Sequence, residues 1–413
     1  MDWAFLSRGD SMSRRILLGL LVLVAGVARG DFPLNSFQSP PWDVKAIQSA
    51  SVPPTWGKLE NGVREVYFPG EPYKGKPTRV FAYYGKPEGE GPFPAMVLVH
   101  GGGGKAFPDW VRHWTKRGYC AIAMDLAGHG PSGRLEDGAP DQGDETKFID
   151  FSPENPRDMW TYHAVADVIR ANNLIRSQKE VDPNRIGVTG ISWGGYLTCI
   201  VAGTDDRFRV AVPVYGCGFL QEDSAWKGSR FDKMTPEHRD RWVKTFDPSQ
   251  HVGRTACPIL FLNGTNDFAY PMGSYKKTFD LVQSPKTMSM RVRLPHGHIW
   301  SFGEVDAFVD AVLNGGKPLA KVGELTIQGD KASTIVSAST GLREGRFNFA
   351  KAEGPWQTRE WKTVPAKIVI VEGKDNQKTI EAPLPKERPI AFYLSVVDDR
   401  GLEVSTTHMV LEK

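Results

Sequence analysis

Ile186-Gly187-Val188-Thr189-Gly190-Ile191-Ser192-Trp193-Gly194-Gly195-Tyr196 is the stretch of this 413-residue chain that says most about its fold. A short apolar run, typical of a β-strand, ends at Gly190, and a helical pattern begins near Gly194. Ser192 lies at the junction in a Gly-x-Ser-x-Gly frame, which predicts a sharp strand-to-helix turn that holds a strained serine with its hydroxyl exposed. The residues two before and two after the serine crowd each other in such a turn, so both must be small.

The Gly-x-Ser-x-Gly frame by itself arises by chance in roughly one chain in ten of this length, so its surroundings decide the interpretation. Strand-like and helical segments alternate on both sides of it, after two strand-like segments that suit an antiparallel start. The alternation predicts an α/β fold, with a mostly parallel sheet flanked by helices. The expected strands are 65–68, 78–84, 94–100, 120–124, 186–190, 208–215, 258–262 and 288–294, and the expected helices are 109–117, 160–176, 195–202, 275–281 and 302–313.

The pattern changes after Gly315-Gly316-Lys317-Pro318. Residues 320–413 show no convincing helical pattern and contain short alternating runs at 324–327, 334–338, 367–371, 390–397 and 406–411. This pattern predicts a small all-β domain resembling a sandwich. We therefore expect an α/β domain over 31–316 and a β domain over 317–413.

The N-terminus has the pattern of a secretory signal peptide. Arg14 and Arg15 precede the apolar run 16–28, and small residues follow. The run is too short to span a bilayer, which takes about 20 residues. We expect a signal peptide over 1–30, starting at Met1 or Met12, and hence a secreted or periplasmic protein. An uncleaved anchor is the alternative.

Composition excludes several classes of function. Hydrophobic residues make up 40% of the chain and charged residues 24%, as in globular proteins. The formal net charge of +3 comes without a basic block, so nucleic-acid binding is not expected. The four cysteines are widely spaced and show no zinc-binding pattern, which favours small core residues. The sequence predicts no metal and no cofactor.

Two glycine-rich loops call for different interpretations. The loop His100–Gly104 follows an expected strand, and its glycines have no side chains that would block access to the backbone N–H groups. We expect the N–H groups of Gly102 and Trp193 to form an oxyanion hole. Lys105 is followed by Ala106 rather than Ser or Thr, which argues against a phosphate-binding loop. The loop Gly128–Gly133 fits a dinucleotide-binding pattern only literally, because Pro131 interrupts it and no helical pattern follows.

A serine becomes a nucleophile when a histidine takes its proton and a carboxylate orients that histidine. In strand-to-helix turns of this kind the acid follows the serine in the chain, and the histidine follows the acid. Asp267 follows the expected strand 258–262, and both His296 and His298 follow the strand 288–294. A metal pair is the competing interpretation, but no third ligand is near. We favour His298 as the base, because Gly297 frees the chain to turn whereas His296 directly follows Pro295.

From about residue 63 to 315 the chain resembles the α/β-hydrolase superfamily, and within it the branch of acetyl xylan esterase, cephalosporin-C deacetylase and dienelactone hydrolase. The motifs that carry the resemblance are spread in order over this range. They are His100–Gly104, Arg117-Gly118-Tyr119, Gly128-x-Gly130-x-Ser132, Val181-Asp182-x-x-Arg185-Ile186, Gly190-x-Ser192-x-Gly194-Gly195, Gly264-x-x-Asp267 and Gly297-His298.

The resemblance implies a serine esterase that hydrolyses acetyl esters of polysaccharides through an acyl-enzyme. Ser192, Asp267 and His298 would then be the catalytic residues, with a small-molecule or polysaccharide ester as substrate. Two long segments between expected strands, 127–157 and 217–256, are here called the first and second excursions. They would form a cap, in which Trp226 and Trp242 either stack on sugars or pack internally. The alternatives are a serine peptidase of the prolyl-oligopeptidase type and a carbohydrate-binding protein on a catalytically retired hydrolase scaffold. The sequence does not indicate an oligomeric state.

Overall fold

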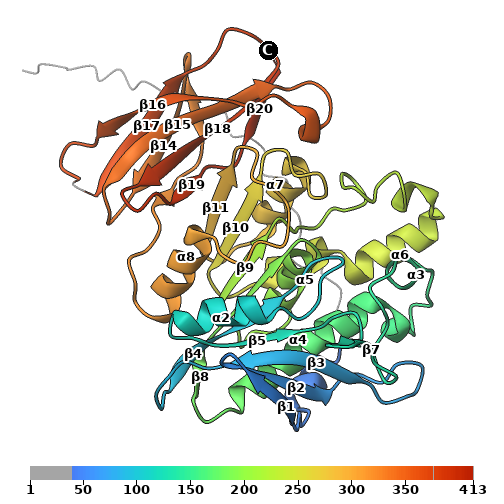
Figure 1. Cartoon of the computed structure of the whole chain (residues 1–413). Helices are drawn as coiled ribbons and strands as arrows, with labels where there is room; N and C mark the ends of the chain where they lie inside the picture. The colour runs from blue at the N-terminus through green and yellow to red at the C-terminus, as the bar shows by residue number, and fades with distance from the viewer. Residues whose placement is uncertain (1–39, 375, 413) are drawn as a thin grey trace, which may run out of the picture. The chain divides into compact units, whose positions relative to one another are not determined.

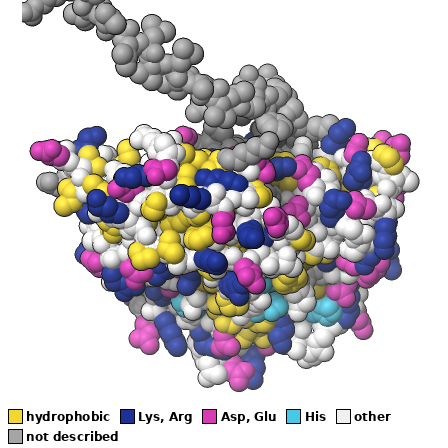
Figure 2. Space-filling model, turned by 90° about the horizontal axis from the view of Figure 1, so that it is seen from above, with side chains coloured by type: hydrophobic (Ala, Val, Ile, Leu, Met, Phe, Trp, Pro, Cys, Tyr) yellow, Lys and Arg dark blue, Asp and Glu magenta, His cyan; other side chains and the backbone are white. Residues whose placement is uncertain are grey.

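The computed structural model of the protein describes residues 40–374 and 376–412 (Figure 1). The predicted signal peptide, 1–30, lies outside the described residues. Over the described ranges, no helix is both long and apolar enough to cross a membrane. Acidic, basic and apolar side chains are interspersed on the face of the molecule shown in Figure 2, in keeping with the small net charge.

Six parallel strands form the centre of the main sheet, in the order β5-β4-β8-β9-β10-β11. Beyond β5, the strands β3, β2 and β1 continue the sheet with antiparallel pairing. The predicted mostly parallel sheet with an antiparallel start is thus confirmed. The strands are β1 (Thr55–Glu60), β2 (Val63–Pro69), β3 (Arg79–Gly85), β4 (Phe93–Val99), β5 (Cys120–Met124), β8 (Val181–Ile191), β9 (Val210–Val214), β10 (Ile259–Gly264) and β11 (Lys286–Arg291).

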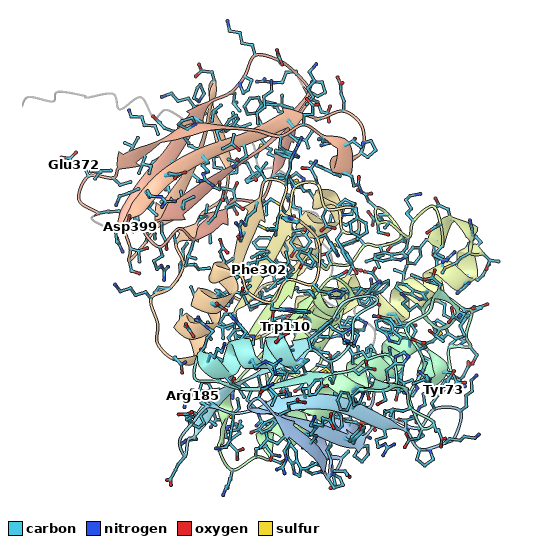
Figure 3. All side chains as sticks on the ribbon, in the orientation of Figure 1. Tyr73, Trp110, Arg185, Phe302, Glu372 and Asp399 are labelled. Carbon is cyan, nitrogen blue, oxygen red and sulfur yellow. The ribbon has the colours of Figure 1, made fainter. Side chains whose placement is uncertain are left out.

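Helices cover both faces of this sheet, because successive side chains of its buried strands point to opposite sides. Val97 and Val99 of β4 join one core layer, with side chains of α4 and α5, whereas Met96 and Leu98 join the other, with α2 and α8. Trp110 of α2 and Phe302, which precedes α8, are labelled in Figure 3. The helices are α1 (Val44–Ser49), α2 (Pro108–Lys116), α4 (Trp160–Arg176), α5 (Trp193–Ala202), α7 (Met272–Leu281) and α8 (Gly303–Leu313).

The two predicted excursions contact each other. Trp242 donates from its indole nitrogen to the carbonyl oxygen of Lys147 at 2.7 Å, and Arg230 forms an ion pair with Asp144. Trp242 is fully buried, so of its two expected roles internal packing is correct. The first excursion contains β6 (His129–Gly130), β7 (Gly133–Arg134), α3 (Asp144–Lys147) and η2 (Pro156–Asp158), and the second contains η3 (Phe231–Lys233), α6 (Pro236–Phe246), η4 (Pro248–Gln250) and η5 (Val252–Arg254).

The C-terminal part of the chain consists of antiparallel strands and one short 3-10 helix, which agrees with the predicted extra β domain. Strands β15 and β17 fall outside the runs expected from the sequence. The elements are β12 (Lys321–Val322), β13 (Thr326–Gln328), β14 (Lys331–Ser337), β15 (Leu342–Lys351), η6 (Trp356–Thr358), β16 (Lys362–Ile370), β17 (Gln377–Pro383), β18 (Ile390–Asp398), β19 (Glu403–Ser405) and β20 (Met409–Leu411).

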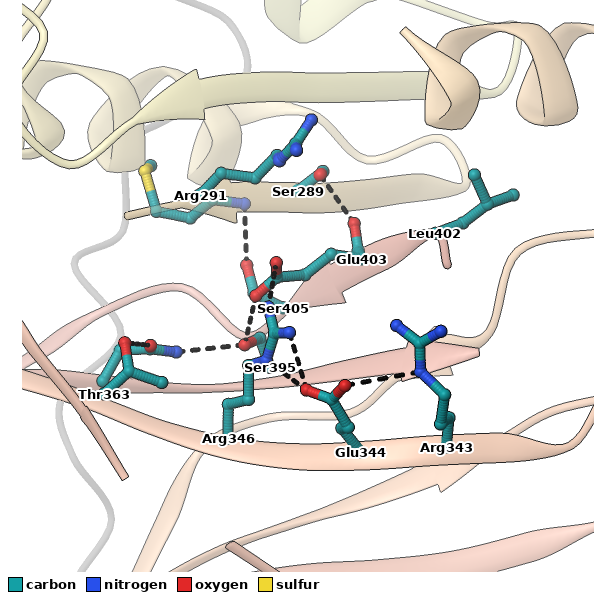
Figure 4. Close-up of polar contacts among 12 residues, drawn as sticks. Ser289, Arg291, Arg343, Glu344, Arg346, Thr363, Ser395, Leu402, Glu403 and Ser405 are labelled. Atoms are coloured by element: carbon teal, nitrogen blue, oxygen red, sulfur yellow. Dashed lines mark hydrogen bonds and ion pairs between the residues drawn. The ribbon is translucent and has the colours of Figure 1, made fainter. Parts of the chain in front are cut away.

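Strand β19 of the C-terminal part pairs with β11 of the main sheet (Figure 4). The hydroxyl of Ser289 donates to the carbonyl oxygen of Glu403 at 2.7 Å, and the N–H of Met290 donates to the hydroxyl of Ser405 at 3.0 Å. The N–H of Glu403 also donates to a carboxylate oxygen of Glu304 at 3.0 Å. The main sheet therefore continues into the C-terminal part, and the division of the chain at 316 stays a prediction.

Candidate active site

Ser192 occupies the strained turn that the sequence predicts. Its φ of 56° and ψ of −121° lie in a region that residues with a Cβ rarely adopt. A Cβ on Gly190 would lie 2.2 Å from the carbonyl oxygen of Gly194, and a Cβ on Gly194 would lie 2.0 Å from that of Val99. Both glycines are thus required by close backbone packing, as expected.

The glycine loop after β4 lies directly against this turn. A Cβ on Gly101 would come within 2.9 Å of the Cβ of Ser192, and one on Gly102 within 2.9 Å of Cδ1 of Trp193. The N–H of Gly104 donates to the carbonyl oxygen of Gly101 at 3.1 Å, which closes a turn with Gly103 at a φ of 64°. The structure therefore brings Gly102 and Trp193 together beside the serine.

His100 anchors the glycine loop to the neighbouring strand, a role that the sequence did not reveal. Its Nε2 accepts a hydrogen bond from the N–H of Leu126 at 2.9 Å, so Nδ1 carries the proton and donates to the carbonyl oxygen of Gly101 at 2.8 Å. Burial lowers the pKa of this imidazole, which keeps it neutral. A neutral ring with both nitrogens bonded is suited to holding backbone in place.

Asp267 contacts His296. Its Oδ2 lies 2.6 Å from Nδ1 of His296, and its Oδ1 accepts hydrogen bonds from the N–H groups of Ala269 at 2.9 Å and Tyr270 at 2.8 Å. Since an ionised carboxylate only accepts, Nδ1 carries the proton and Nε2 is left as the nitrogen that can take another. This arrangement matches that of an orienting acid and a general base.

Asp267 thus contacts His296 and not His298, the histidine favoured from the sequence, and which of the two is the base stays a prediction. His298 is exposed and contacts Phe107 and Trp300, with ring centroids 5.2 and 5.8 Å away, and burial lowers its pKa. The expectation placed the strand end at 294, which left His296 little chain with which to turn. In the structure β11 ends at Arg291 and Arg293 adopts a φ of 52°, so the chain turns before Pro295.

Tyr215 links the serine turn to the histidine loop and was not singled out from the sequence. The preceding residue, Val214, accepts a hydrogen bond from the N–H of Ser192 at 3.0 Å. The ring of Tyr215 lies 4.4 Å from that of His296, and its hydroxyl donates to the carbonyl oxygen of Gly297 at 2.5 Å. The residue directly after β9 thus connects the Ser192 turn with the loop that carries His296.

Two family models match the chain. The model described as acetyl xylan esterase matches residues 61–226, and that of the prolyl oligopeptidase family matches residues 153–310. Acetyl esterase Axe7A of Xylanibacter ruminicola is 22% identical over 221 residues, which cover 50% of this chain and 50% of the relative. An uncharacterized peptidase, YuxL of Bacillus subtilis, is 22% identical over 226 residues, which cover 51% of this chain and 31% of the relative. The chain thus spans half or less of the length of these relatives.

Two solved structures have the same fold over most of their length. The acetyl xylan esterase from Paenibacillus sp. R4 superposes with a TM-score of 0.54 at 23% identity, covering 65% of this chain and 92% of that one. Acetyl xylan esterase 1 from Thermoanaerobacterium sp. JW/SL YS485 gives a TM-score of 0.52 at 21% identity, over 65% and 90%. The protein therefore has the α/β-hydrolase fold. Together with the family model and the acetyl esterase relative, these structures confirm the predicted resemblance to the acetyl xylan esterase branch.

A buried lysine, which the sequence did not reveal, lies beside the turn that carries Ser192. Nζ of Lys147 lies 4.5 Å from the ring centroid of Trp193, the residue after Ser192. Its ion pair with Asp144 is long, at 3.8 Å, and Arg230 also binds that carboxylate. Burial lowers the pKa of Lys147 to about 8. The buried ammonium group of Lys147 therefore carries a desolvation cost that destabilises the folded state.

Replacing Lys147 with methionine is expected to raise the free energy of unfolding by about 1 kcal/mol near neutral pH, because a buried charge disappears. Between about pH 8 and 10.5 the folded wild type releases a proton that the unfolded chain keeps, so wild-type stability rises with pH in this window. The advantage of the variant should therefore shrink as the pH rises.

The measurement is the midpoint of urea unfolding at about pH 7 and about pH 9.5 for the wild type and Lys147→Met. Lys244→Met, at an exposed position of α6, is the matched control and should show no such pH-dependent difference. A variant less stable than the wild type at both pH values would mean that the aromatic and Asp144 contacts outweigh the cost of burial.

Proposed function

We propose that this hydrolase is a secreted or periplasmic serine esterase that removes acetyl groups from polysaccharides. The observation that carries the proposal is the 2.6 Å contact between Asp267 and His296, in a fold that places a strained Ser192 beside a glycine loop. Its match to the acetyl xylan esterase family model supports the substrate class. Export rests on the predicted signal peptide 1–30.

In the proposed mechanism the hydroxyl of Ser192 attacks the ester carbonyl, and Nε2 of His296 takes its proton. The carboxylate of Asp267 holds the tautomer that leaves Nε2 free and stabilises the imidazolium. The N–H groups of Gly102 and Trp193 would bind the oxyanion, and each donor of this kind is worth roughly 100- to 1,000-fold in rate. His296 then returns the proton to the leaving alcohol, and water cleaves the acyl-enzyme in a second round.

A peptidase of the prolyl-oligopeptidase type is the second candidate. The family model of that group matches residues 153–310, a range that contains Ser192, Asp267 and His296. A retired scaffold that only binds carbohydrate is less well supported, because it gives no reason for a strained serine and an oriented histidine.

The test is a release assay over substrates of both classes. The esterase should liberate acetate from several acetylated glycans and leave a dipeptide amide containing proline intact. Hydrolysis of the dipeptide amide without acetate release would favour the peptidase. A folded protein that fails to react with a fluorophosphonate probe would favour the retired scaffold.

A further inference from the structure

A cavity of about 450 Å³ lies beside the Asp267–His296 pair, and no role has yet been given to it. Its walls come from the loop after β10, the loop after β11 and the C-terminal segment around η6. The lining residues with polar, charged or aromatic side chains are Asn266, Asp267, Phe268, Arg293, His296, Gln357, Thr358 and Arg359, so two arginines face one carboxylate. The segment around η6, between β15 and β16, thus contributes directly to the surroundings of the proposed base.

The C-terminal wall of this cavity is held to the loop that carries the acid. Asn266, which precedes Asp267, donates from Nδ2 to the carbonyl oxygens of Arg359 at 2.9 Å and Gln357 at 3.1 Å. The guanidinium of Arg359 lies 3.7 Å from the ring centroid of Trp356, which in turn contacts His408. Hydrogen bonds and ring contacts therefore hold this wall of the cavity in place.

The cavity is lined by two guanidinium groups that lack ion pairs. Over the described residues, neither Arg293 nor Arg359 lies within ion-pair distance of a carboxylate. Arg359 donates from Nε and Nη2 to the carbonyl oxygen of Gly354, while its Nη1 is buried without a partner in the same part of the chain. Burial lowers the pKa of Arg359, and the carboxylates of Asp223 and Glu412 interact with its charge only beyond ion-pair distance. Unpaired arginines favour an anionic ligand, since a guanidinium binds a planar oxyanion with two hydrogen bonds.

An exposed aromatic ring supplies an apolar surface in the same cavity. Phe268 directly follows Asp267, is 60% exposed, and lies 4.7 Å from the ring of His296. Because this exposed ring lines the cavity beside the proposed base, it offers an apolar face to a bound ligand. The C–H face of a sugar ring is a suitable partner for it.

We propose that this cavity binds an anionic sugar residue next to the one that carries the acetyl ester. Phe268 packs against the sugar ring, and Arg293 and Arg359 bind its carboxylate or sulfate group. This inference rests on the proposed esterase function and specifies its substrate class as an acidic acetylated polysaccharide.

The experiment compares kcat/KM of the full chain on three polymers: neutral acetylated xylan, acetylated xylan bearing glucuronic acid, and an acetylated sulfated galactan. Arg293→Gln and Arg359→Gln should each lower kcat/KM on one or both anionic polymers by about 10-fold or more, as expected for a lost hydrogen bond to a charged group. Their values on neutral xylan and on p-nitrophenyl acetate should stay within about 2-fold. The polymer that responds identifies carboxylate or sulfate as the ligand.

Arg343→Gln, at a position that does not line the cavity, is the matched control and should leave all four values unchanged. Equal loss on neutral and anionic polymers, or no loss on either anionic polymer, would overturn the proposal. Arg293→Gln decides the case if Arg359→Gln proves to unfold the η6 segment, because Arg293 is exposed and lies outside that segment.

Binding separates this proposal from the proposed function. Calorimetry with Ser192→Ala and an acidic oligosaccharide should show binding that weakens at high salt and in Arg293→Gln. Binding without acetate release by the wild type would keep the anionic site and reject the esterase function. Acetate release without such binding would keep the esterase and reject the site.

Discussion

Ser192→Ala is expected to lower the rate of hydrolysis of a soluble acetyl ester by at least about 1,000-fold while the protein stays folded. Alanine removes the hydroxyl and keeps the Cβ, so the turn at a φ of 56° gains no new clash. The backbone contacts of the turn, including the hydrogen bond from the N–H of Ser192 to Val214, do not involve the lost atom.

Initial rates and the melting temperature should be measured together for this variant. Ser229→Ala, on an exposed loop of the second excursion, is the matched control and should retain full activity. Activity above a few per cent of wild type in folded Ser192→Ala would place the nucleophile elsewhere.

His296→Ala is expected to lose about 1,000-fold or more in kcat, whereas His298→Ala should lose less than about 10-fold. The reason is that Asp267 contacts Nδ1 of His296, which fixes the ring as a base, while His298 contacts the aromatic rings of Phe107 and Trp300. The two variants control for each other, since each removes one imidazole from the same loop.

The pH dependence of kcat distinguishes loss of the base from a purely structural defect, since a structural defect would not change the shape of the pH profile. Loss of the base should flatten the acidic limb of the profile in His296→Ala, and that limb should persist in His298→Ala. A nearly inactive His298→Ala beside an active His296→Ala would reverse the assignment.

The fold could be predicted because the buried parallel strands are continuous apolar runs, such as 95–99 and 120–124, that alternate with helical patterns. The turn at Ser192 was partly predictable from local sequence, since a Cβ on Gly190 would clash with the backbone of Gly194, four residues later. The space at Gly194 is limited by the distant Val99, a contact that no local pattern encodes. Strands β15 and β17 were missed because they carry charged and small residues that break the alternation.

The contact between Asp267 and His296 was not foreseen because the choice of histidine depended on where β11 ends, and strand ends are the least certain part of a pattern. Other features of the site depend on contacts between distant segments, which no local pattern encodes. Lys147 approaches Trp193 from the separate helix α3, and Asn266 contacts a segment about 90 residues away. Such contacts follow from tertiary packing and become visible only in the folded chain.

The pairing of β19 with β11 sets an order of events during biosynthesis. Ser289 and its partner Glu403 are 114 residues apart, so the ribosome completes β11 and the histidine loop long before it delivers the strand that covers them. During that interval β11 is an edge strand with unpaired backbone groups, a known risk for association between chains. All the proposed catalytic residues are therefore synthesised well before β19 can pair with β11. We expect the exposed edge of β11 to need protection from aggregation until the C-terminal strands emerge.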